Sequence, residues 1–245
     1  MNLQELNKRG FDIEARNHAL AVLENDFPKP LNEICHTLVE FQIADVELVY
    51  GGGGEADSTQ RLRRALTKLD WHKQKIVISK IVDGEERSAI SHEIDHVRKD
   101  EKGSIALEIE WNNKDPFFDR DLENFHRLHS EGVISVGIIV TRGKSLQKNL
   151  HHIVAQCGEN HGIREISDLE LFNLHPTPRQ RAKIESGKGD FVSRWARAFV
   201  QDKFGTATTH WGKLLERINR GVGNPCPLLL IGIPNNSIYQ QREVS

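Results

Sequence analysis

Three carboxylates, those of Asp95, Glu108 and Glu110, occur close together in the sequence and are the residues best suited to chemistry. The two glutamates belong to a segment, residues 105–111, in which apolar residues alternate strictly with others. One face would carry Ile105, Leu107, Ile109 and Trp111, and the other would carry Ala106, Glu108 and Glu110. A period of two predicts a half-buried β-strand, with both glutamates on the same side.

A second predicted strand, residues 90–97, precedes the first, and a polar connection joins the two. If they pair symmetrically about that connection, Asp95 lies opposite Glu108 and Glu93 lies opposite Glu110. Opposed side chains in an antiparallel pair are about 5 Å apart, and like charges there are destabilising. Such acids usually need a cation, and oxygen ligands in a chain with few cysteines favour Mg²⁺ over zinc. The alternative is that the acids only keep an edge strand solvated.

The composition is that of a globular protein, with 38% hydrophobic and 28% charged residues among 245. No apolar run is long enough to cross a membrane, and the first residues lack the apolar stretch of a secretion signal. Three widely spaced cysteines argue for a reducing compartment, so we expect a cytoplasmic protein. Because the net charge is -2, any contact with nucleic acid must come from a local basic region.

The chain is predicted to form one mixed α/β domain over residues 1–245, because no linker or repeat divides it. Residues 1–74 are expected to be a largely helical N-terminal part, with Ala15 and Ala19 on one face of its first helix. Residues 75–235 are expected to form the core that carries the chemistry, with inserted helices. Periodicity predicts helices at 60–69, 119–130, 145–156, 191–204 and 211–219, and further strands at 75–82, 133–140 and 227–233.

The order Asp95, then Glu108-Ile-Glu110 on the next strand, then a helix and a buried strand, resembles the PD-(D/E)xK nuclease core. The final lysine of that motif is absent, and Glu110 stands in its place. Within the superfamily, the chain resembles the BamHI, BglII and BstYI group of type II restriction endonucleases, which also depart from lysine there. Two further stretches carry the likeness, LENFHRLHSEGVISVGIIV at residues 122–140 and NPCPLLLIGI at residues 224–233.

This resemblance implies a central mixed β-sheet flanked by helices, in a prokaryotic enzyme that acts as a homodimer on double-stranded DNA. Each copy would cut one strand of a short, roughly palindromic site and leave 5′-phosphate and 3′-hydroxyl ends. The enzyme would depend on Mg²⁺, held by Asp95 and Glu108, with Glu110 as a second-metal ligand or a general base. Glu93 is a candidate assisting acid. The helices at 119–130 and 145–156 are the candidate dimer interface.

Base readout needs polar side chains that reach the major groove, whereas phosphate contacts position the DNA without reading it. Candidates follow the predicted strand at 105–111, follow the predicted strand at 133–140, or precede the predicted helix at 211–219. In the group that the chain resembles, this last region carries recognition residues. The candidates are Asn112, Asn113, Lys114, Arg142, Lys144, Thr208, Thr209 and His210. The alternatives are that Thr208 or Thr209 only caps a helix, and that Arg142 and Lys144 are ordinary solvated charges.

Three other interpretations are open. The first is a zinc site, although the spacings of its candidate ligands match no strong zinc pattern. Those ligands are His151, His152, Cys157 and His161, or His92 and His96 on either side of Asp95. The second interpretation is another PD-(D/E)xK nuclease, such as a repair or Holliday-junction enzyme. The third is a DNA-binding module without catalysis.

Overall fold

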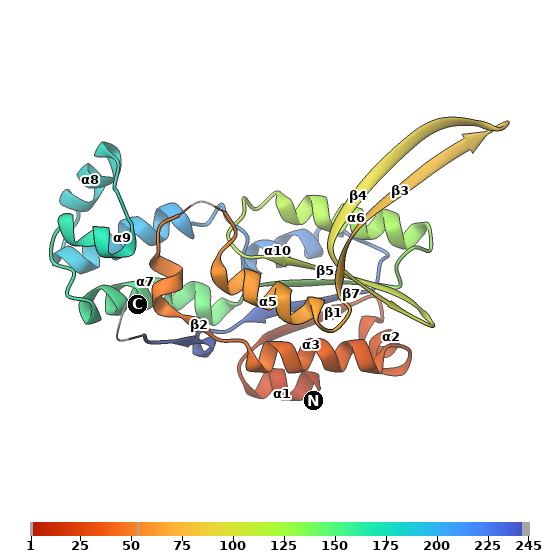
Figure 1. Ribbon diagram of the computed structural model, residues 1–245, viewed down its shortest axis with the longest axis horizontal. Helices are drawn as coiled ribbons and strands as arrows, with labels where there is room; N and C mark the ends of the chain where they lie inside the picture. The colour runs from red at the N-terminus through yellow and green to blue at the C-terminus, as the bar shows by residue number, and fades with distance from the viewer. Residues whose placement is uncertain (1, 53, 242–245) are drawn as a thin grey trace.

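The computed structural model describes residues 2–52 and 54–241. At its centre lies a six-stranded mixed sheet in the order β1-β7-β6-β5-β4-β3 (Figure 1). Strands β5, β6 and β7 are parallel to one another, and the other neighbours are antiparallel. The strands are β1 (Asp12–Arg16), β3 (His72–Val82), β4 (Glu85–Asp100), β5 (Gly103–Glu110), β6 (Val136–Arg142) and β7 (Leu228–Ile233). The short strands β2 (Ile43–Ala44) and β8 (Ile238–Tyr239) form a separate parallel pair.

Helices cover both faces of the sheet, as the mixed α/β prediction required (Figure 1). One apolar cluster joins the sheet to helices α3 and α5, and another joins its opposite face to α6 and α10. Helices α7, α8 and α9 form a lobe at one end, around a third cluster. The helices are α1 (Leu3–Lys8), α2 (Ala19–Asn25), α3 (Pro28–Glu40), α4 (Asp45–Val49), α5 (Asp57–Thr67), α6 (Phe117–Ser130), α7 (Lys144–Asn160), α8 (Pro178–Glu185), α9 (Phe191–Lys203) and α10 (Trp211–Asn219).

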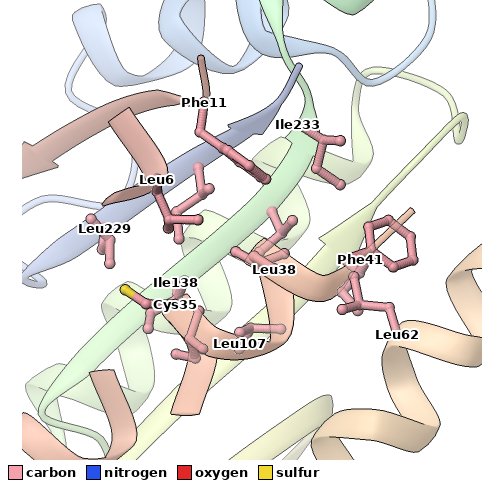
Figure 2. Close-up of a cluster of buried hydrophobic side chains, with 14 of the residues drawn as sticks. Leu6, Phe11, Cys35, Leu38, Phe41, Leu62, Leu107, Ile138, Leu229 and Ile233 are labelled. Atoms are coloured by element: carbon pink, nitrogen blue, oxygen red, sulfur yellow. The ribbon is translucent and has the colours of Figure 1, made fainter. Parts of the chain in front are cut away.

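Strand β5 is buried on both faces, and the prediction of a half-buried strand was wrong on this point. Leu107 packs into the first cluster, which Figure 2 shows together with residues of α3, α5, β6 and β7. Ala106 packs on the other side, into the cluster that contains α6. The alternation itself is confirmed, but α6 covers the second face, so Glu108 and Glu110 are each only 3% exposed.

The N-terminal part is mostly helical as predicted, but it also supplies β1, which the periodicity did not indicate. Ala15 lies in this strand, and the helix expected around it begins only at Ala19. The main chain of β1 pairs antiparallel with β7, from Asp12 opposite Gly232 to Arg16 opposite Leu228. The N-terminal part therefore provides one edge of the central sheet.

Strands β3 and β4 form a long hairpin that extends beyond the rest of the sheet (Figure 1). A turn at Asp83 and Gly84 joins them, and both residues have positive φ, as a tight hairpin turn requires. The remaining predicted helices and strands are confirmed within a few residues at each end. No helix in the described part of the chain is long and apolar enough to span a membrane.

Candidate active site

The hairpin of β4 and β5 has the symmetric register predicted from the sequence. Its pairs run from Asp100 opposite Gly103 to His96 opposite Leu107, so Asp95 and Glu108 are next in register. The backbone N–H of Asp95 donates to Glu108 Oε1 at 3.4 Å. Two of the three predicted acids are therefore neighbours across the end of this ladder.

Strand β4 contains a β-bulge at Asp95. On the partner strand β3, His72 pairs with Val97 and Gln74 pairs with Ile94, so two residues of β4 face one residue of β3. A bulge twists its strand and redirects a side chain, and bulges are common beside active sites. Ile94 and Val97 both pack into the cluster around α6, whereas Asp95 between them is exposed. The bulge therefore turns Asp95 towards solvent at the point where β4 leaves β5.

Glu93 does not reach Glu110, because upstream of the bulge β4 pairs only with β3. Glu93 lies opposite Lys75, and its carboxylate is 2.6 Å from Lys73 Nζ. Its side chain is 59% exposed. The geometry makes Glu93 a partner of a surface lysine rather than a member of the acid group.

A fourth acid, Asp121 of α6, completes the group and was missed in the sequence. It is 0% exposed and carries Oδ2 without a hydrogen-bond partner. It lies within hydrogen-bonding reach of Glu110, and Arg120 forms ion pairs with both carboxylates, at 2.7 Å to Asp121 and 3.6 Å to Glu110. The available signal was spacing, because Asp121 occupies a position of the buried stripe formed by Phe118, Leu122 and Phe125.

The buried acids disfavour one another's charge. Burial, and then the neighbouring carboxylates, raise the pKa of Glu108 well above its ordinary value. The same two causes raise the pKa of Glu110 to about 8, and burial also raises the pKa of Asp121. Without a cation, the Glu110 side chain therefore holds a proton near neutral pH.

The chemistry of this donor set fits a hard divalent cation, because it consists of carboxylate oxygens whose mutual repulsion a cation would relieve. The unpartnered oxygen of Asp121 adds a further buried acceptor. In the described residues, however, no three histidine, cysteine or acidic side chains are already arranged around one point that could hold a metal. The acids lie near one another, but their carboxylate oxygens do not yet surround a common point.

We expect the metal-free protein to lose stability as the pH rises from about 6.5 to about 8. The folded-state pKa of Glu110 is raised to about 8, so the folded chain keeps a proton that the unfolded chain has lost, and the free energy of unfolding falls with pH. Below about 6.5 His96 opposes this trend, since burial lowers its pKa to about 4. Thermal melting in chelator at both pH values measures the effect, and Glu110→Gln should flatten it. An unchanged slope in that variant would contradict the raised pKa.

The zinc interpretation gains no support from the described residues. Burial raises the pKa of the Cys157 thiol, which keeps the sulfur protonated and a poor zinc ligand. The Nδ1–H of His161 donates to the Cys157 carbonyl, one helical turn earlier, at 2.8 Å. His92 bonds to Asn124 of α6 at 2.7 Å, which makes it part of the packing behind the hairpin.

Two of the predicted DNA-reading segments lie side by side. Lys114 and Thr208 form an isolated antiparallel bridge, and the N–H of Thr209 donates to the Asn113 carbonyl at 2.8 Å. The side chain of Asn113 donates to Glu110 Oε2 at 2.9 Å. The candidate readout segments are thus joined to each other and to the acid group.

The side chains of these segments differ in how far they can reach. Asn112, Asn113 and Lys114 are exposed, whereas Thr209 is 0% exposed. The N-cap of α10 is His210, whose ring accepts from the Gly212 N–H at 3.2 Å, so neither threonine is the cap.

Arg142 is fully buried, and its guanidinium is committed to protein acceptors. It donates to the carbonyl of Trp111, to the amide oxygen of Gln147, to the Thr208 hydroxyl and to the Thr209 carbonyl, at 2.6–2.7 Å. It therefore connects the end of β5 with the segment before α10 and presents no group to a phosphate. Lys144, by contrast, is exposed at the first position of α7.

The comparisons agree with this arrangement. Residues 11–233 match the family model described as Restriction endonuclease BglII/BglIII. A search of curated proteins found no match.

Proposed function

Because the chain belongs to the BglII/BglIII restriction endonuclease family, whose members cleave DNA at specific sites, we propose that Asp95, Glu108 and Glu110 are its catalytic acids. The substrate would be a short, roughly palindromic duplex site, cut in both strands to leave 5′-phosphate and 3′-hydroxyl ends. One observation carries the assignment. Asp95 and Glu108 are neighbours at the end of the β4–β5 ladder, and Glu108 and Glu110 are both buried on β5 near a fourth acid, Asp121.

In this proposal Asp95 and Glu108 hold Mg²⁺, and Glu110 either joins them or accepts a proton from the attacking water. When bound, the ion would supply positive charge that activates water and offsets the charge developing on the phosphorus. Asn113 donates to Glu110 and fixes the direction of its carboxylate. Asp121 and Arg120 contact the same carboxylate from α6 and hold it against the strand.

Cleavage of duplex DNA is expected to require Mg²⁺. Excess chelator should abolish cutting, and added Mg²⁺ should restore it, because the ion is proposed to activate the attacking water and to offset the charge that develops on the phosphorus. The measurement is an agarose-gel assay on long DNA, followed by sequencing of the ends. Cutting that persists undiminished in chelator would exclude this chemistry.

We also expect a homodimer. The described residues contain one such acid group, while cutting both strands of a symmetric site needs two. Of the proposed interface helices, α7 packs against α4 and α9, whereas α6 packs against β5, β6 and α10. The outer side of α6 carries the exposed ion pair of Glu123 and Arg127. Sedimentation should give a dimer, free or on DNA; a monomer that cuts both strands in one binding event would refute this.

Two alternatives remain, a repair nuclease of the same superfamily and a DNA-binding module that does not cut. The family match favours a restriction enzyme over both. Sequencing the products separates them: a restriction enzyme yields one repeated sequence at the ends, a repair nuclease yields ends set by DNA structure, and a binding module yields no new ends.

A further inference from the structure

A cleft lies beside Asp95, between helix α5 and the turn that follows β5. Its volume is about 330 Å³. The polar residues that line it come from α5 and the segment just before it, from the bulge of β4 and from the turn after β5. They are Glu55, Thr59, Arg63, Asp95, His96, Asn112 and Asn113.

Arg63 is the cation of this cleft. It lies one helical turn after Thr59, on a different side of α5 from the buried Leu62 and Leu66. Its guanidinium is 2.9 Å from the Glu55 carboxylate, in a pair that is 49% and 33% exposed. An exposed ion pair contributes little stability, so Arg63 can exchange Glu55 for another anion at small cost.

His96 supplies an independent sign that the cleft takes a polar ligand. Its side chain is 2% exposed, it lines the cleft, and neither ring nitrogen has a hydrogen-bond partner. An imidazole ring carries at least one N–H, so one of these nitrogens can donate to a ligand in the cleft. Buried polar groups without partners are uncommon in folded proteins, because each costs free energy.

The charge of the neighbouring acids explains why a cation is needed here. A DNA phosphate that approaches Asp95 meets a carboxylate of the same sign, and Glu108 and Glu110 place two more acids on the neighbouring strand β5. Lys73 is close but already pairs with Glu93 at 2.6 Å. Arginine suits the task, since its planar group donates two parallel hydrogen bonds to phosphate oxygens.

We propose that this cleft binds one backbone phosphate of the cleaved strand, with Arg63 as its main ligand and Thr59, His96 and Asn112 as further donors. The inference rests on the proposed function, because the phosphate would belong to the strand that the Asp95 centre cuts. Arg63 is then a positioning residue, which holds the DNA backbone in place next to the acids.

The test compares Arg63→Ala with Arg64→Ala, a matched control one residue away on the same helix. Arg64 is exposed and lines a different groove, with Lys68 and His36. Binding is measured in chelator, on a duplex that carries the site mapped from the wild-type cleavage products. Binding is also measured on a series of these duplexes, in each of which a different single phosphate is replaced by an uncharged methylphosphonate.

We expect wild-type protein to lose affinity at several methylphosphonate positions. Arg63→Ala should bind the unmodified duplex roughly ten- to a hundred-fold more weakly and become insensitive to one position per half-site. The salt dependence of its binding should lose about one phosphate contact per subunit. Arg64→Ala should keep the wild-type pattern of sensitive positions, and Arg63→Lys should recover part of the affinity. Equal melting temperatures will show that both alanine variants are folded.

The inference fails if Arg63→Ala keeps the wild-type methylphosphonate pattern, or if it weakens binding no more than Arg64→Ala while the wild-type protein still cuts. A wild-type protein that cuts no DNA in Mg²⁺ would instead overturn the proposed function, and this inference with it.

Discussion

Replacing Asp95 with alanine, or Glu108 with glutamine, is expected to lower the rate of DNA cleavage by roughly a thousand-fold or more. Each change removes one of the carboxylates proposed to hold Mg²⁺. Binding should persist in both variants and become tighter in Asp95→Ala, because the exposed acid that repels the phosphate backbone is gone. Single-turnover cleavage and a gel-shift assay measure the two effects separately.

Glu93→Ala is the matched control for this experiment. Glu93 lies two residues before Asp95 on the same strand, but it is exposed and paired with Lys73. We expect this variant to cut within a few-fold of the wild type. If Asp95→Ala or Glu108→Gln cuts equally well, the assignment of the centre is wrong. If Glu93→Ala is as inactive as they are, Glu93 belongs to the centre after all.

Replacing Arg142 with methionine is expected to destabilise the fold by roughly 3–5 kcal/mol, because each buried acceptor that is left without a donor costs about 1–3 kcal/mol. The change leaves the carbonyls of Trp111 and Thr209 without the donors that they now have. For a chain of this size, the melting temperature should fall by roughly 10 °C. The preference of the protein for its specific DNA site should also fall, because the segment before α10 loses the hydrogen bonds from Arg142 that hold it in place.

Lys144→Met is the control for Arg142→Met. Lys144 is two residues away and exposed, and its loss should leave the melting temperature almost unchanged. Should its removal weaken binding to all DNA sequences equally, Lys144 is a phosphate contact, as predicted from the sequence. A stable Arg142→Met protein with normal specificity would show that the network does not hold the segment.

The local features of this protein could be predicted from its sequence, because they depend on neighbouring residues. The alternation in residues 105–111 requires a strand, and a short polar connection leaves an antiparallel hairpin as the simplest pairing. That pairing placed Asp95 beside Glu108, and the structure has the same register. The resemblance to the restriction endonuclease group rested on the order of these local elements, and the family match bears it out.

Only the tertiary structure decided which residues surround the acids, because that depends on contacts between distant segments. The packing of α6 against β5 buried both glutamates and brought Asp121 close to them, and no local pattern shows which strand the buried side of a helix will contact. Arg142 was a candidate phosphate ligand in the sequence. In the structure its guanidinium is buried and donates to four protein acceptors, so it holds two segments together instead. Glu93 is separate from the group because the β4–β5 ladder ends at His96 and Leu107, and upstream of it β4 pairs only with β3.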